Sequence, residues 1–189
     1  MSLVDATSGA ETVVPAGKWS VDASRSKVAF AVKHMVFTRM NGRFRNFDGT
    51  LEVGSGVPRA MGVVTAASID TNELVRDEHL RSSSDFFDVE HYPEISFNST
   101  RIDYLDGGRF RICGDLTMRS VTRELELDAQ LAGKRREAGD DERIELELRG
   151  ELDRRDFGLT WNQVLDTGGA LLGNKVKIAL EISAVKSLQ

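Results

Sequence analysis

Three histidines and one cysteine are the side chains whose types could support chemistry in this chain of 189 residues. The histidines are His34, His79 and His91, and no two of them have the spacing of metal ligands on a helix. No H-E-x-x-H motif occurs, so the pattern argues against a metal site. Cys113 is the only cysteine, which excludes an internal disulfide and a cysteine-rich zinc site. Its strand-like neighbours indicate a wall residue rather than a nucleophile.

The motifs of common enzyme classes are missing from the sequence. There is no G-x-S-x-G nucleophile elbow and no glycine-rich loop of the P-loop or dinucleotide-binding type. Most carboxylates fall on the outward faces of predicted strands, so no catalytic constellation is visible. The sequence therefore predicts a non-catalytic protein without a cofactor.

His34 and Arg154 stand out because both fall on the apolar face of a predicted strand. A histidine in that position is either a hydrogen-bonded rim residue or a polar group that faces a cavity. A buried arginine without a partner would cost several kcal/mol. Arg154 is therefore expected at the mouth of a cavity, beside a carboxylate or beside a ligand.

The composition is that of one globular domain, with 40% hydrophobic and 29% charged residues and a net charge of −5. No basic block occurs, which argues against nucleic acid as a partner. No apolar run approaches the length of a membrane span, and the first residues do not resemble a signal peptide. As written, the chain is expected to be cytoplasmic, or periplasmic or secreted if a leader has been removed. Residues 1–16 are predicted to be a disordered arm and residues 17–189 a barrel.

Alternating apolar and polar residues predict eight strands, most of them joined by hairpins. Sequential antiparallel pairing with little helix favours an up-and-down barrel over a sandwich. The expected fold is all-β, an eight-stranded antiparallel barrel with one helical segment inserted after the third strand. Its interior is either filled by side chains or shared with one small ligand. The predicted strands are 26–36, 41–53, 59–69, 94–104, 109–118, 121–131, 144–154 and 175–185.

The stretch 68–97 is where the strand pattern breaks. Thr71 or Asn72 is predicted to cap a short helix, because a short side-chain oxygen accepts the free N–H groups of the first turn. Phe86 and Phe87 follow the helix and suggest a lid over one end of the barrel; the alternative is a plain crossover helix.

Two further features bear on the interior. Phe44 and Phe47 fall on opposite faces of their strand unless a bulge between them brings both to the same side. The segment 163–173 is a glycine-containing excursion and a second candidate lid.

The chain carries a set of short motifs that recur in one known family. They are W-S-V-D (19–22), S-K-V-A-F-A-V-K-H-M (26–35), G-R-F-R-N-F-D-G (42–49), A-S-I-D-T (67–71), R-D-E-H-L-R-S with F-F-D-V-E-H-Y-P-E-I-S-F (76–97), G-D-L-T-M (114–118) and R-R-D-F-G-L (154–159). By these motifs the chain resembles the YceI-like polyisoprenoid-binding family. The resemblance spans about residues 19–182, and its most specific part is the segment 76–97. It implies an extended, lipocalin-like antiparallel barrel that holds a long isoprenoid chain in its lumen. It also implies that some relatives are secreted or periplasmic and that some form dimers, so a homodimer is possible.

Together these features predict that the barrel binds a long-chain isoprenoid or related lipid. One five-carbon unit contributes up to ~3 kcal/mol, so a few units supply the affinity and the polar end sets the direction. Phe86 and Phe87 are expected to wall one end. His34 and Arg154 are the candidate donors to a quinone, phenol or phosphate oxygen. The residues predicted to line the lumen are Phe30, Val32, Val36, Met61, Val63, Phe97, Phe110, Leu146, Leu148, Ile178 and Leu180.

Two alternatives from other functional classes are kept open. One is an enzyme that acts on a lipid or quinone, with His34 or His79 as acid or base. The other is a filled barrel that serves as a structural or partner-binding module.

Overall fold

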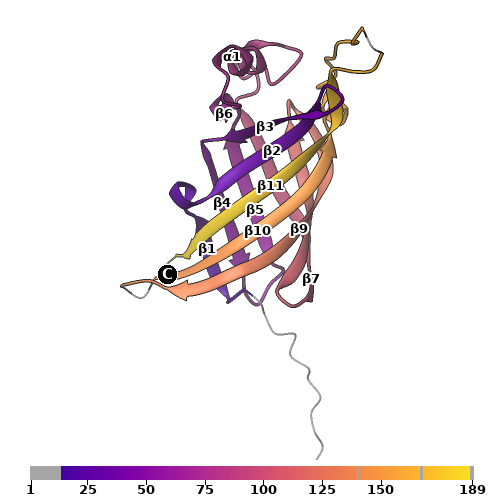
Figure 1. Cartoon of the computed structure of the whole chain (residues 1–189). Helices are drawn as coiled ribbons and strands as arrows, with labels where there is room; N and C mark the ends of the chain where they lie inside the picture. Colours follow the sequence, from indigo (N-terminus) through magenta and orange to yellow (C-terminus); the bar gives the residue numbers. More distant parts are fainter. Residues whose placement is uncertain (1–13, 140, 167, 188–189) are drawn as a thin grey trace, which may run out of the picture.

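The computed structural model describes residues 14–139, 141–166 and 168–187 of the chain (Figure 1). Within these residues a single α-helix, α1 (Leu74–Ser82), interrupts a succession of strands, and three short 3-10 turns bend the chain. The turns are η1 (Ala23–Arg25), η2 (Ala66–Ser68) and η3 (Arg154–Phe157). The strand segments are β1 (Gly17–Val21), β2 (Lys27–His34), β3 (Thr38–Phe44), β4 (Phe47–Val53), β5 (Arg59–Thr65), β6 (Ile69–Asp70), β7 (Glu94–Asp106), β8 (Arg109–Met118), β9 (Val121–Arg136), β10 (Glu142–Asp153) and β11 (Leu172–Lys186).

Three pairs of these segments act as single strands, so the sheet closes as an eight-stranded antiparallel barrel. β1 and β2 both pair with β11, one with each of its halves, and η1 separates them. In the same way β3 with β4, and β5 with β6, form two continuous strands around the sheet. The pairing of β1 with β11 closes the ring and leaves α1 after the third strand. The predicted fold class is therefore confirmed.

The break between β3 and β4 brings two phenylalanines to the same side of the wall. The ladder is interrupted at Arg45 and Asn46. The N–H groups of both residues donate to Ser68, to its carbonyl and its hydroxyl respectively, and the carbonyl of Asn46 accepts from the N–H of Thr65. Phe44 and Phe47, on either side of this break, both line the interior cavity. The predicted bulge is thus confirmed in its effect on side-chain direction.

Helix α1 begins one residue later than its predicted caps allow. The carboxylate of Glu73 accepts hydrogen bonds from two N–H groups of the first turn, at 3.1 and 2.8 Å. Thr71 is buried, and its N–H and hydroxyl both donate to Oδ1 of Asp77. Asn72 lies between Thr71 and Glu73 in the chain and has a positive φ of 61°. The prediction that Thr71 or Asn72 is the N-cap is wrong. Glu73 caps the helix, and Thr71 instead bonds to the side chain of Asp77 within it.

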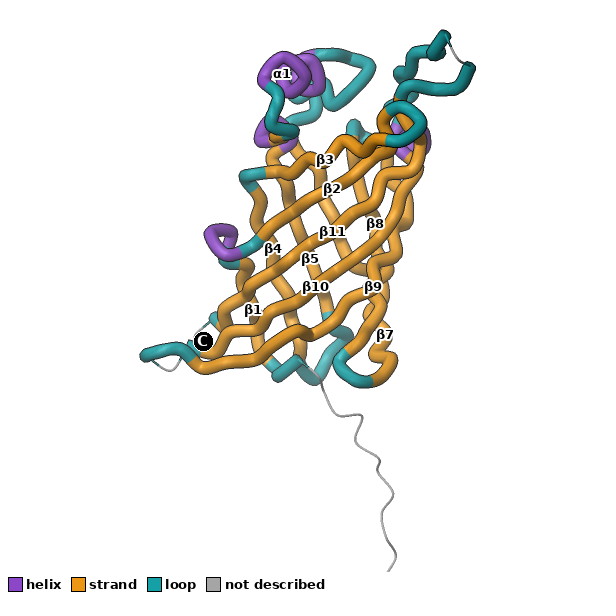
Figure 2. Tube along the Cα trace, viewed as in Figure 1, coloured by secondary structure: helices purple, strands orange, loops and turns teal. Residues whose placement is uncertain are grey.

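The two ends of the barrel differ in construction (Figure 2). One end carries α1, the β2–β3 turn and the loop between η3 and β11; we call it the helix end. The other carries the short turns and the first strand. There Trp19 is fully buried, and its Nε1 donates to the carbonyl of Pro15 at 3.0 Å. Residues 1–13 of the predicted disordered arm lie outside the described residues, whereas Val14 is packed into the core with 7% exposure.

A buried arginine lies where β1 meets β11, near the β9–β10 hairpin; we call this place the seam of the barrel. Arg143 donates to Asp22 at 3.0 Å, to the hydroxyl of Ser183 at 2.8 Å and to Glu137 at 3.2 Å. A hydrogen bond from Arg25, together with one from Arg143, lowers the pKa of Glu137 below 4.5. A hydrogen bond from Ser24, with further help from Arg143, lowers the pKa of Asp22 below 3.8.

These carboxylates predict an acid-sensitive seam. Because their pKa values are lower in the folded state, their stabilisation is complete above about pH 4.5 and is lost as the pH falls through the folded pKa values. We expect the urea midpoint to fall between pH 6 and pH 3, and to fall less steeply in Arg143→Met. Equal pH slopes for the two proteins, measured by circular dichroism, would show that this network does not contribute.

Candidate functional site: an apolar cavity in the barrel

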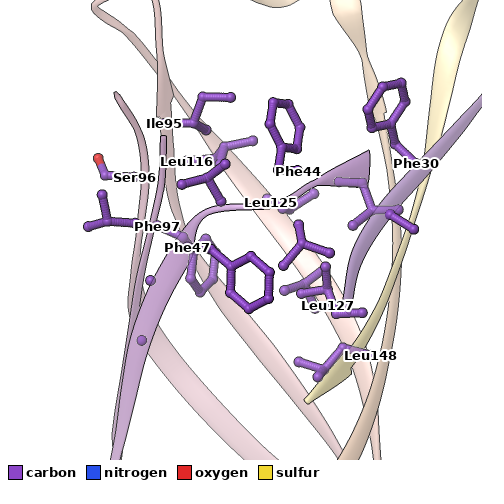
Figure 3. Close-up of a pocket in the computed structure, with 18 of the residues that line it drawn as sticks. Phe30, Phe44, Phe47, Ile95, Ser96, Phe97, Leu116, Leu125, Leu127 and Leu148 are labelled. Carbon is purple, nitrogen blue, oxygen red and sulfur yellow. The ribbon is translucent and has the colours of Figure 1, made fainter. Parts of the chain in front are cut away.

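The interior of the barrel contains a cavity of about 290 Å³. This volume is near the lower end of the range for small-molecule pockets, roughly 300 to 1,000 Å³. Figure 3 shows Phe30, Phe44, Leu127 and Leu148 directed into one interior space from different strands. The cavity extends from Trp19 at one end to residues of α1 and η3 at the other. It is therefore long relative to its width.

The lining is almost wholly apolar. Among the described residues, the only lining side chains with polar atoms, apart from the indole of Trp19, are Asp48, Thr50, Ser96 and Arg154. The Asp48 side chain is exposed, and its carboxylate accepts a hydrogen bond from the N–H of the next residue at 2.7 Å. The hydroxyl of Ser96 points away from the other labelled side chains in Figure 3. An apolar ligand therefore fits this space better than a polar one.

Gly62 accounts for part of the empty space. Gly49 of β4 lies opposite Gly62 of β5, and both line the cavity. A Cβ at position 62 would meet only the carbonyl oxygen of Asp48, at 3.7 Å, so no neighbour fills the place of the missing side chain. By contrast, the ring of Phe97 lies 2.5 Å from where a Cβ of Gly114 would be. Gly62 therefore leaves a void, whereas Gly114 makes room for a ring and Gly49 for the Met61 carbonyl oxygen, which would lie 2.9 Å from a Cβ there.

Aromatic rings connect the cavity wall to the segment that closes the helix end. The Phe44 ring lies 5.6 Å from that of Phe30 and meets the Phe87 ring edge-on at 5.8 Å. The Phe86 ring lies 5.5 Å from Trp161. Such pairs contribute about 0.5–1.5 kcal/mol each beyond their burial. Phe86 and Phe87 therefore wall one end of the cavity, as a lid would.

The structure brings most of the predicted lumen residues together around this cavity. That they bind a ligand stays a prediction. The predicted residues that line the cavity are Phe30, Val32, Met61, Val63, Phe86, Phe87, Phe97, Leu146, Leu148, Arg154, Ile178 and Leu180.

Three predicted residues lie elsewhere. Val36 is in the β2–β3 turn and is 63% exposed, because the strand ends at His34, before the alternation reaches it. His34 is half-buried at the end of β2, beyond the cavity, and its carbonyl accepts a hydrogen bond from Thr38. Phe110 is buried in the core near the β7–β8 turn, where packed side chains fill the barrel. None of the three borders the cavity.

Met61 and Val63 border the cavity without pointing into it. Their exposed fractions are 54% and 39%, and the inward face of β5 carries Ala60, Gly62 and Val64 instead. The predicted inward direction of Met61 and Val63 is therefore wrong. They border the cavity because Gly62, which lies between them, has no side chain to cover the strand on its inner face.

Arg154 has a full set of protein partners. It is 4% exposed, and its guanidinium donates to the carbonyls of Leu159 and Trp161 at 2.6 and 2.8 Å and to that of Gly173 at 2.8 Å. Longer contacts reach Leu172 at 3.4 Å and Asn174 at 3.5 Å. Burial lowers the pKa of this guanidinium below 12.5. Arg154 therefore ties the loop after η3 to the start of β11, and no donor is left over for a ligand.

Several cavity residues were not predicted, although some signals were present. Leu125 and Leu127 alternate with acids in β9, so the period-2 pattern placed them inward. Leu80 of α1 and Leu159 after η3 gave no strand signal, because they reach the cavity from outside the sheet.

His79 is exposed and lies edge-on to the rings of Phe86 and Trp161.

Two features are absent from the described residues. Nowhere in 14–139, 141–166 and 168–187 do three or more histidine, cysteine, aspartate or glutamate side chains gather as a metal site would require. In that same part of the chain, no helix has the length and apolar character needed to cross a bilayer.

Comparison with known proteins gives consistent matches over the barrel. The model of the YceI-like domain family matches residues 19–184. UPF0312 protein ECA1782 of Pectobacterium atrosepticum is 32% identical over 167 residues, which cover 87% of this chain and 84% of that protein. The crystal structure of Burkholderia cenocepacia BcnA aligns with a TM-score of 0.72 at 20% identity, covering 86% of this chain and 98% of that one.

A further structural neighbour carries a functional description. It is a polyisoprenoid binding domain from Saccharophagus degradans implicated in plant cell wall breakdown. Its TM-score is 0.65 at 16% identity, and the alignment covers 89% of this chain and 98% of that one. At these identities the two structural likenesses establish the fold alone.

Proposed function

Because the chain belongs to the YceI-like domain family, we propose that its barrel binds and carries a long-chain isoprenoid or related lipid without transforming it. The observation that carries the proposal is the apolar cavity of about 290 Å³ inside the barrel. The description of a structural neighbour as a polyisoprenoid binding domain supports the choice of ligand class.

The energetics favour an occupied cavity. Apolar space left unfilled inside a barrel is destabilising, because the lining side chains lose packing contacts there, and the cost rises with the volume left empty. Each buried isoprene unit contributes up to ~3 kcal/mol. A hydrocarbon tail therefore recovers much of that cost. A tail longer than the cavity has to displace the aromatic wall at Phe86 and Phe87 or extend past it.

The alternative of lipid chemistry finds less support in the positions of the histidines. Neither His34 nor His79 borders the cavity. His79 is held edge-on between two rings, and His34 lies beyond the cavity at the end of its strand. The alternative of a filled barrel is disfavoured by the void beside Gly62. Carriage is the function that the geometry supports best.

Thermal unfolding with a defined prenol tests the proposal. Adding farnesol should raise the unfolding temperature with saturation, by several degrees when farnesol exceeds its Kd about a hundredfold. A short alcohol such as butanol serves as the control, because it cannot fill the cavity. If neither farnesol nor a long-chain fatty acid shifts the transition of lipid-stripped protein, the barrel does not bind such chains.

A further inference from the structure

One outer face of the barrel at the helix end is strongly basic. A depression of about 330 Å³ lies over β2, β3 and the neighbouring parts of β10 and β11. Among the described residues of its lining Asp153 is the one acid, although the whole chain has a net charge of −5. We call this surface the basic face. Its cationic residues are Lys33, Arg39, Arg155, Lys175 and Lys177.

Two of these cations oppose each other without an acidic partner. Lys33 of β2 and Arg39 of β3 are directly paired in register, and both are exposed. Like charges in that arrangement destabilise a sheet. Neither has an ion pair within the part of the chain that the structure describes, whereas Lys175 is paired with Glu151 at 2.8 Å. An external anion is therefore the partner that would relieve this pair.

An apolar turn lies between these two strands. Met35, Val36 and Phe37 connect β2 to β3, with exposed fractions of 49%, 63% and 96%. Other exposed apolar side chains, on α1 and in the loop before β11, lie at the same end of the barrel (Figure 1). They are Leu74, Val75 and Val164, each at least 78% exposed. A projecting apolar turn flanked by unpaired cations suits an anionic bilayer, whose headgroups attract the cations while the interface takes up the apolar side chains.

We propose that the helix end of the barrel docks on an anionic lipid bilayer. Val36 and Phe37 enter the interface, and Lys33 and Arg39 contact the lipid phosphates. The docked end is the one that Phe86 and Phe87 wall, so docking presents the lid of the cavity to the membrane. The inference goes beyond lipid carriage, since docking does not require an occupied cavity.

Flotation with vesicles tests the proposal directly. The full chain is mixed with phosphatidylcholine vesicles, with or without about one-third phosphatidylglycerol, and the bound fraction is measured. We expect binding to the phosphatidylglycerol vesicles that weakens with salt. Near an anionic surface one basic residue contributes about fivefold to partitioning. K33E/R39E should therefore lower the partition coefficient at least about tenfold, and V36S/F37S by a similar factor.

Matched variants at the other end serve as controls. K18E/K134E makes the same charge change near the short turns, and V57S/L105S removes exposed apolar side chains there; both should bind vesicles like the wild type. F37W should shift its fluorescence to the blue when phosphatidylglycerol vesicles are added. The farnesol shift should be unchanged in all five variants, which separates loss of docking from loss of lumen binding and reports folding. No binding by the wild type, or equal losses in both sets of variants, overturns the proposal.

Discussion

Replacing Gly62 with phenylalanine is expected to abolish most binding of a long-chain lipid while the barrel remains folded. The new ring enters the cavity, because a Cβ at this position meets only the carbonyl oxygen of Asp48, at 3.7 Å. It takes the place of about one isoprene unit, up to ~3 kcal/mol, so affinity should fall between about tenfold and a hundredfold. Farnesol titration followed by unfolding temperature measures the change. The ligand-free variant should be at least as stable as the ligand-free wild type, since a void is filled.

The neighbouring residue provides the control. Val63→Phe adds an aromatic ring to the same strand, but the side chain at 63 points outward and is 39% exposed. It should bind farnesol with nearly the wild-type affinity. If Gly62→Phe keeps the wild-type affinity, or if both variants lose it equally, the cavity beside Gly62 is not the binding site.

Replacing Arg154 with methionine is expected to cost at least about 3 kcal/mol of unfolding free energy. The substitution removes hydrogen bonds to the carbonyls of Leu159, Trp161 and Gly173, and a buried carbonyl without a partner costs about 1–3 kcal/mol. Burial of the guanidinium, at 4% exposure, means that water cannot easily replace it. Urea unfolding at neutral pH measures the loss.

The adjacent Arg155 is the matched control for that experiment. It is exposed and pairs with Asp153 at 2.6 Å, which lowers the pKa of that carboxylate to about 2. Because exposed ion pairs contribute little, Arg155→Met should leave stability nearly unchanged. The opposite result, unchanged stability in Arg154→Met with altered preference for the lipid head group, would restore the hypothesis that Arg154 is a ligand donor.

The number and order of strands could be predicted because most strands have one polar and one apolar face. In β10 the outward acids alternate with Ile144, Leu146 and Leu148, so the direction of each side chain follows from the period of two. β5 lacks this contrast, since both of its faces are nearly apolar. The alternation alone does not decide which face is inside, and the prediction that Met61 and Val63 face the lumen took the outer face for the inner one.

The cavity itself depends on contacts that periodicity does not contain. Whether a barrel is hollow depends on which inward positions are small and which neighbours fill them, as at Gly62 and Gly114. The role of Arg154 depends on carbonyls up to 19 residues away, brought to it by the loop after η3. The cap of α1 was missed because Asp77 engages Thr71, a side-chain contact across six residues that helix propensity does not specify.

Native mass spectrometry of freshly purified protein, with lipid extraction, tests the central proposal most directly. The wild type should carry a mass excess that matches one long-chain lipid per barrel, and the extract should contain that lipid. Gly62→Phe, purified in parallel, should carry much less. Wild-type protein that shows only its own mass and yields no lipid, even after exposure to farnesol, would contradict the account.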